Sequence, residues 1–73
     1  MPDRYIKTVK DFGAILRETR CQEGLTQQQL ALSSGTGERF IVDLEAGKET
    51  VQLGKALRIA AALGIKITMS DEF

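Results

Sequence analysis

The chain has 73 residues, of which 42% are hydrophobic and 27% are charged, and its ten basic and ten acidic side chains cancel. This size and composition argue against intrinsic disorder and predict one small globular domain over residues 1–73. With no histidine and a single cysteine, Cys21, the sequence offers neither an internal disulfide nor a zinc cluster. No apolar run is long enough for a membrane span and no export signal is apparent, so we expect a cytoplasmic protein without metal or cofactor.

The first predicted helix begins at Thr8, because a threonine oxygen can cap the amide of Asp11 three residues later. The acid at that position also lies at the positive end of the helix dipole. Gly24 is expected to end this helix. Apolar positions recur between these ends at helical spacing: Val9, Phe12, Ile15, Leu16 and Thr19.

The second predicted helix begins at Thr26, where Gln29 three residues later completes the pattern of a capping box. It is expected to bury Leu30 and Ala31 and to stop at the Ser-Ser-Gly of residues 33–35. A helix of about two turns is not stable alone, so we expect neighbouring elements to support it.

Two further helices are predicted after this turn. The third runs from about residue 37 to 46 and is ended by Gly47. Its expected buried side chains are Phe40, Ile41 and Leu44. The fourth, expected to be the longest, starts at Thr50 or Gln52. Its expected buried face consists of Leu53, Ala56, Leu57, Ala60 and Leu63.

The end of the chain has a different pattern, in which apolar and polar residues alternate. This period of two predicts a short β-strand over about residues 65–70. A single strand leaves its backbone groups unpaired, so it needs a partner, either near Tyr5 and Ile6 or in a second copy of the chain. In the second case the dimerisation residues are Ile65, Lys66, Ile67, Thr68 and Met69.

Two short helices joined by the sequence SSGTG match the helix-turn-helix pattern, in which the second helix enters the major groove of DNA. The segment LTQQQLALSSGTGERFIVDLEAGK, residues 25–48, resembles the XRE or phage-repressor type of helix-turn-helix protein. With the continuation LRIAAALGI the resemblance covers roughly residues 10–65. The positions that match are Leu25, Thr26, Gln27, Leu30, Ala31, Gly35, Ile41, Leu44, Glu45, Gly47 and Lys48.

This resemblance implies a mainly α-helical fold, a phage-repressor-like bundle of four to five helices. Within the family, residues 35–69 are similar to HipB-like antitoxins, in which a terminal strand pairs between two subunits. The alternation in residues 65–69 agrees independently with such a strand. The resemblance therefore implies a homodimeric transcriptional repressor that binds double-stranded operator DNA and neutralises a HipA-like kinase toxin.

The resemblance assigns the DNA contacts to the start of the second helix and to the third helix. Free amides at a helix N-terminus favour a phosphate, and Gln27 beside them can bond a phosphate or a base edge without adding charge. The guanidinium of Arg39 fits guanine O6 and N7, although a surface ion pair is the alternative. The full set of candidates is Gln27, Gln28, Thr36, Gly37, Glu38, Arg39, Val42, Asp43 and Lys48.

Two of these candidates, Glu38 and Asp43, depart from the amides and hydroxyls that are usual in the family. A carboxylate repels phosphate but can accept a hydrogen bond from cytosine N4. Alternatively, either acid orients Arg39. The sequence leaves both interpretations open.

The remaining candidates each have a structural alternative. Gly37 allows close approach to DNA or is a turn glycine, and Val42 contacts a thymine methyl or is simply exposed. Lys48 matches the family's phosphate-contacting residue, with a solvated loop lysine as the alternative. Glu45 is expected to be structural and to pair with Arg17 of the first helix.

Two alternative functions remain open besides an antitoxin. The chain is either a stand-alone XRE-type regulator or a protein-interaction module that has the fold without DNA binding, as the zero net charge and two acids allow. Enzymatic catalysis is disfavoured, because Cys21 has no histidine as a base. The operator sequence, its half-site spacing and any inducer are not encoded in a recognisable way.

Overall fold

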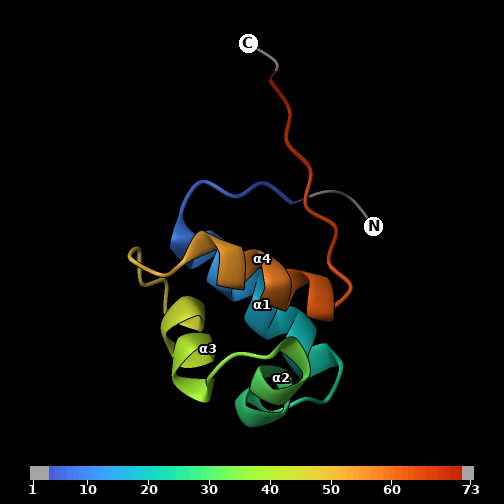
Figure 1. Cartoon of the computed structure of the whole chain (residues 1–73). Helices are drawn as coiled ribbons and strands as arrows, with labels where there is room; N and C mark the ends of the chain where they lie inside the picture. The colour runs from blue at the N-terminus through green and yellow to red at the C-terminus, as the bar shows by residue number, and fades with distance from the viewer. Residues whose placement is uncertain (1–3, 72–73) are drawn as a thin grey trace.

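The computed structural model describes residues 4–71, so that residues 1–3 and 72–73 of the predicted domain lie outside it. Within this range the chain forms four helices and no strand: α1 (Val9–Gln22), α2 (Gln27–Ser34), α3 (Glu38–Glu45) and α4 (Leu53–Ala62). Helix α3 packs against α1 and α2, and α2 also packs against α4 (Figure 1). The predicted helical bundle is therefore confirmed, with four helices.

Both predicted capping boxes are present and fix the starts of α1 and α2. The Thr8 hydroxyl accepts from the Asp11 amide at 3.1 Å, and the Asp11 carboxylate accepts from the Thr8 amide at 3.2 Å. In α2 the equivalent bonds join Thr26 and Gln29 at 3.0 and 2.8 Å. Gly24, as predicted, follows the end of α1 with φ of +70°, a conformation that glycine adopts without strain.

The four helices enclose one apolar core, to which each of them contributes. Its buried members are Leu16, Leu30, Ala31, Ile41, Leu44, Ala56, Ile59, Ala60 and Leu63. The buried pairs predicted for the second and third helices, Leu30 with Ala31 and Ile41 with Leu44, are confirmed. Phe40 is half-buried and packs against this core.

The prediction for the fourth helix was partly wrong. Its buried stripe runs through Ala56, Ile59 and Ala60, whereas Leu53 and Leu57 are 66% and 43% exposed. Leu53 and Leu57 fit a helical stripe in the sequence, but packing against α2 sets which side of α4 faces inward. Helix α4 is also not the longest, because it has 10 residues and α1 has 14.

A glycine allows α1 and α3 to approach each other closely. A Cβ atom on Gly13 would overlap the carbonyl oxygen of Leu44 and press on the Cα of Glu45. This contact brings the C-terminal end of α3 against α1 and so fixes how α3 is presented.

The β-strand predicted for the C-terminal segment was wrong for the single chain. Residues 65–71 have no regular secondary structure: Ile65 still packs against the core, and the end of the segment extends away from the helices (Figure 1). Ile6, Ile65 and Ile67 line one small apolar hollow, but no backbone ladder joins the two segments within residues 4–71. An extended segment without a backbone partner cannot form a strand.

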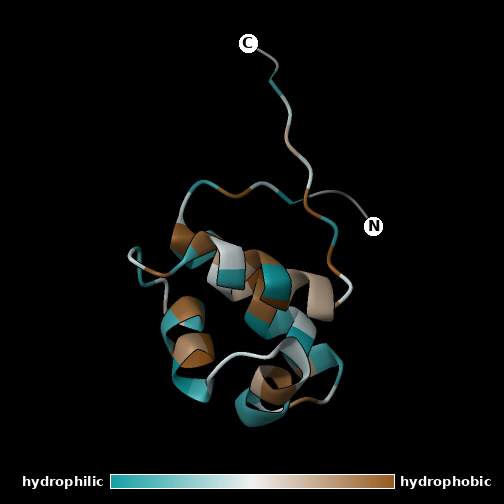
Figure 2. Ribbon diagram, in the orientation of Figure 1, coloured by the Kyte–Doolittle hydropathy of each residue, from teal (hydrophilic) through white to brown (hydrophobic). Residues whose placement is uncertain are grey.

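Hydrophobic residues remain at the surface at this end of the molecule. Ile67 and Met69 in the extended segment are 40% and 98% exposed, and brown stretches mark hydrophobic residues along it in Figure 2. Among the described helices, none combines the length and the apolar composition that a membrane span requires.

Candidate nucleic-acid interface

The turn between α2 and α3 is fixed by its own hydrogen bonds. Gly35 ends α2 in the left-handed region, with φ of +71°. The buried Ser34 hydroxyl donates to the Leu30 carbonyl at 2.8 Å and bonds the Thr36 hydroxyl at 3.0 Å. Gly37 then forms the start of α3 without a side-chain cap, so that the first amides of this helix face outward unoccupied by a side chain.

Helix α3 has one buried and one exposed face. Ile41 and Leu44 are each 1% exposed and belong to the core. On the other side the Arg39 side chain is 83% exposed. Glu38 is exposed and Val42 is half-buried. Helix α3 packs against α1 and α2 on its inner side. Its outer face is therefore left accessible, as a helix that inserts into a DNA groove requires.

The exposed face of α3 contains a three-residue ion-pair network centred on Asp43. Arg39 Nε lies 3.2 Å from Asp43 Oδ1, and Lys48 Nζ lies 3.6 Å from Asp43 Oδ2. Of the two interpretations left open by the sequence, this geometry favours Asp43 as a group that orients Arg39. Glu38 takes part in no ion pair within residues 4–71.

The start of α2 is tied to the end of α3 through a buried ion pair. Arg20 approaches Glu45 at 2.7 and 3.0 Å, and it also donates to the Leu25 carbonyl at 2.8 Å. The amide nitrogen of Gln27 donates to the same Glu45 carboxylate at 3.2 Å. The hydrogen bonds that Arg20 donates to the Glu45 carboxylate raise the pKa of Arg20 above its usual value. Gln27 is therefore held beside α3 rather than merely solvated.

The predicted pairing of Glu45 with Arg17 was wrong, because Arg20 forms the ion pair. Arg20 lies four residues after the buried Leu16 and so falls on the inward side of α1. Arg17 is one residue off this side and is exposed.

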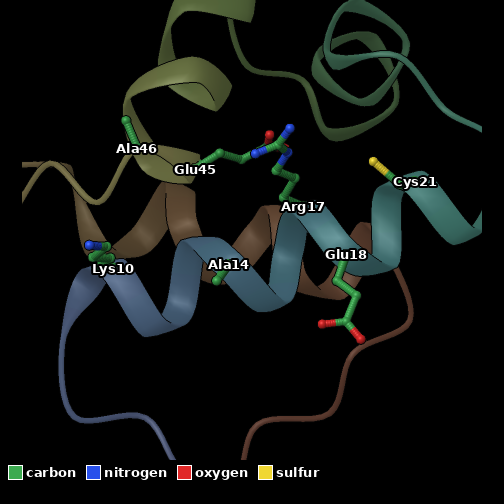
Figure 3. Close-up of a pocket in the computed structure, with 7 residues that line it drawn as sticks. All are labelled: Lys10, Ala14, Arg17, Glu18, Cys21, Glu45 and Ala46. Carbon is green, nitrogen blue, oxygen red and sulfur yellow. The ribbon is translucent and has the colours of Figure 1, made fainter.

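Sequence reasoning missed a groove on the outer face of α1, next to the end of α3 (Figure 3). It has a volume of about 540 Å³ and is lined by Lys10, Ala14, Arg17, Glu18, Cys21, Glu45 and Ala46. Figure 3 shows Arg17 extending from α1 toward Glu45. The α1 members recur at helical spacing, which was the signal available in the sequence.

No group of metal-binding side chains occurs within the described part of the chain.

The predicted DNA-contact residues thus occupy three adjoining places. Gln27 and Gln28 lie in the first turn of α2, and Thr36 and Gly37 lie in the turn before α3. The others follow on α3 and in the loop after it: Glu38, Arg39, Val42, Asp43 and Lys48. Their position is established by the fold, and their contact with DNA remains a prediction.

Comparison with known proteins agrees with this geometry. A family model described as Helix-turn-helix, HTH_3, matches residues 16–69. An uncharacterized HTH-type transcriptional regulator, y4mF of Sinorhizobium fredii, is 52% identical over 64 residues, which cover 88% of this chain and 84% of that protein.

Two solved structures are similar as well. A chain of the HipA–HipB–O2–O3 complex has a TM-score of 0.86 and 23% identity, covering 94% of this chain and 97% of that one. The restriction-modification controller protein C.AhdI from Aeromonas hydrophila has a TM-score of 0.71 and 38% identity, covering 80% and 88%. The predicted XRE-type resemblance is confirmed, and the likeness to HipB is confirmed for the fold. The chain belongs to the helix-turn-helix family, and its relatives include HTH-type transcriptional regulators.

Proposed function

We propose that this chain is a sequence-specific DNA-binding transcriptional repressor whose helix α3 enters the major groove. The observation that supports this most is the division of α3 into a buried side, with Ile41 and Leu44 at 1% exposure, and an outer side with Arg39 at 83%. A recognition helix needs both, because its inner side anchors it while its outer side meets base edges.

In this proposal each exposed group has a stated partner. The terminal nitrogens of Arg39 donate to guanine O6 and N7, and Lys48 contacts a phosphate. The amides at the start of α2, with Gln27 and Gln28, hold a second phosphate. Thr36, Gly37 and Val42 line the same surface.

The proposal includes a homodimer formed through Ile65, Lys66, Ile67, Thr68 and Met69. The Ile65 amide is bonded to the Ala60 carbonyl, but residues 66–71 have no regular secondary structure and make no backbone–backbone hydrogen bond within residues 4–71. A second copy can satisfy these backbone groups by pairing across a two-fold axis. The exposed Ile67 and Met69 would then be covered. Such a dimer presents two α3 helices to successive major grooves about 34 Å apart.

The finer assignment, an antitoxin that neutralises a HipA-like kinase toxin, rests on the resemblance of residues 35–69 and on the fold shared with HipB. A stand-alone regulator is the alternative. Coexpression with a HipA-like kinase from the same genome distinguishes them, because an antitoxin copurifies with the kinase and restores growth. A stand-alone regulator does neither.

The experiment that tests DNA binding is a salt titration with duplex DNA from upstream of the chain's own gene. Fluorescence anisotropy should show an association constant that falls with salt, with a logarithmic slope of about −0.9 per phosphate contacted. A shuffled duplex of equal length is the control and should bind more weakly. No binding at low salt would instead favour the protein-interaction module, which the zero net charge also allows.

A further inference from the structure

We infer that Asp43 is a positioning residue of the DNA-binding surface, which holds Arg39 and Lys48 in place and does not itself contact a base. This inference rests on the proposed function and deepens it. It assigns different roles to the two acids on α3, which the sequence alone left equivalent.

Both carboxylate oxygens of Asp43 are already engaged inside the protein. Oδ1 lies 3.2 Å from Arg39 Nε and Oδ2 lies 3.6 Å from Lys48 Nζ. The Asp43 side chain is 20% exposed, compared with 83% for Arg39 and 58% for Lys48. The acid thus lies beneath the two cations, and the cations are the groups that a ligand meets first.

The ion pair with Lys48 is reinforced by a backbone hydrogen bond. The Lys48 amide donates to the Asp43 carbonyl at 3.0 Å, in the loop that follows α3. Asp43 therefore holds this loop against α3 by its main chain and its side chain together. A cation held in this way loses less conformational freedom when it contacts a phosphate.

The pairing also selects which nitrogens of Arg39 remain available. Asp43 is nearest to Nε, the inner nitrogen of the guanidinium. The two terminal nitrogens keep their donors, and a guanine offers two matching acceptors, O6 and N7. Asp43 thereby leaves Arg39 an end-on, bidentate contact through its two terminal nitrogens.

Glu38 is the residue with which Asp43 is best compared. It carries the same charge, lies on the same helix and is exposed, but it forms no ion pair within the described residues. Glu38→Gln therefore removes a carboxylate from this face without releasing Arg39. Asp43→Asn removes a carboxylate from the same face and also releases Arg39.

The test uses the full chain and duplexes that vary one base pair at a time. Arg39→Ala first identifies the base pair that Arg39 contacts, as the position where discrimination falls about tenfold. Asp43→Asn should then reduce discrimination at that same base pair, by about twofold to tenfold. Glu38→Gln removes an equal charge without releasing Arg39, and should lower discrimination at that pair less than Asp43→Asn does.

The double variant distinguishes positioning from direct contact. In the Arg39→Ala background, Asp43→Asn should have no further effect on discrimination, because it acts through Arg39. Asp43→Glu, which keeps a carboxylate four residues after Arg39, should retain part of the discrimination. Relaxed discrimination at a different base pair would overturn the inference and make Asp43 a base-contacting residue.

A loss of affinity for all duplexes that leaves discrimination at the Arg39 base pair unchanged would also overturn it, because Asp43 would then not act through Arg39. Circular dichroism at the assay temperature checks that each variant is folded. If the unsubstituted chain shows no preference for its upstream DNA, the proposed function itself fails. The other negative result is different: if the unsubstituted chain prefers its upstream DNA and Asp43→Asn keeps the same preference, only the role of Asp43 is overturned.

Discussion

Two arginine–glutamate pairs of equal length show how burial decides what an ion pair contributes to this fold. Arg20–Glu45 and Arg4–Glu18 both have a closest approach of 2.7 Å. The glutamate side chain is 5% exposed in the first pair and 53% in the second. Water screens the exposed pair, whereas the mostly buried Arg20 would keep only its hydrogen bond to the Leu25 carbonyl if Glu45 were removed.

We therefore expect Glu45→Ala to lower the free energy of unfolding by about 1.5–3 kcal/mol, because it removes the charged acceptor of two hydrogen bonds from the mostly buried Arg20. Glu18→Ala is the matched control and should cost at most about 1 kcal/mol. Urea unfolding followed by circular dichroism measures both. Equal losses for the two variants would show that burial is not the deciding factor.

The same pair marks a limit of sequence reasoning about single residues. The sequence predicted a structural role for Glu45, and the structure agrees. The predicted partner, however, was Arg17, whereas the structure shows Arg20. Helical spacing places residues 16 and 20 on one side, yet choosing between arginines three positions apart needs the rotation of α1 about its axis. Only packing against α3 determines that rotation.

Between elements, the close contact of α1 and α3 depends on a missing side chain. Gly13→Ala should destabilise the fold by about 1–3 kcal/mol or more, because the added methyl overlaps the Leu44 backbone. Gly54→Ala is the control: Gly54 is also helical but has open space around it, and this change should stabilise by about 0.5–1 kcal/mol. Thermal unfolding of both variants gives the comparison, and a gain in stability for Gly13→Ala would contradict the described packing.

The caps of α1 and α2 should differ in their dependence on pH. Hydrogen bonding from the Lys7 amide is the main cause that lowers the pKa of Asp11 below its usual value. Asp11 therefore contributes stability above the pKa of the unfolded chain, near about 3.9, and loses it as the pH falls through the lower folded value.

The stability difference between the unsubstituted chain and Asp11→Asn should thus disappear in acid. Thr26→Ala removes the cap of α2, whose partner Gln29 does not titrate, and should cost about 1 kcal/mol at every pH. Chemical unfolding between pH 3 and 7 measures both. A constant Asp11→Asn difference across this range would rule out the ionised cap.

Helix starts were predictable from sequence because their determinants are local. Thr8 and Thr26 cap amides only three residues away, and both predictions were confirmed. The inward face of α4 was not predictable in the same way. Its leucines at positions 53 and 57 fit a helical stripe as well as the buried residues do, and the choice depends on contacts with α2 that are distant in sequence.

For the assembled protein, the prediction concerns the extended C-terminal segment. Deleting residues 65–73 should shift a dimer toward monomer, because it removes the backbone groups proposed to pair across the two-fold axis. Sedimentation velocity measures the change. Arg58→Ala, an exposed change on α4, is the control and should leave the distribution as it was. A truncated chain that stays dimeric would place the interface elsewhere.

The predicted strand shows why the assembly of the protein was harder to infer from sequence than its helices. Alternation in residues 65–69 is a property of the sequence, but a strand exists only when a second backbone is present. The sequence therefore indicates a tendency to form a β-strand, but it does not identify the second backbone with which that strand would pair. The helix-turn-helix, by contrast, uses segments close in the chain, residues 27–45, and was predicted correctly from turn glycines and helix caps.

The central claim is that the outer face of α3, with the start of α2, is the DNA-binding surface. Amide chemical shifts in a ¹⁵N-labelled sample, followed during titration with duplex DNA from upstream of the gene, test it most directly. We predict that the largest changes fall in residues 36–48 and 26–28. Changes concentrated in α4 and residues 65–71, with α3 unaffected, would contradict it.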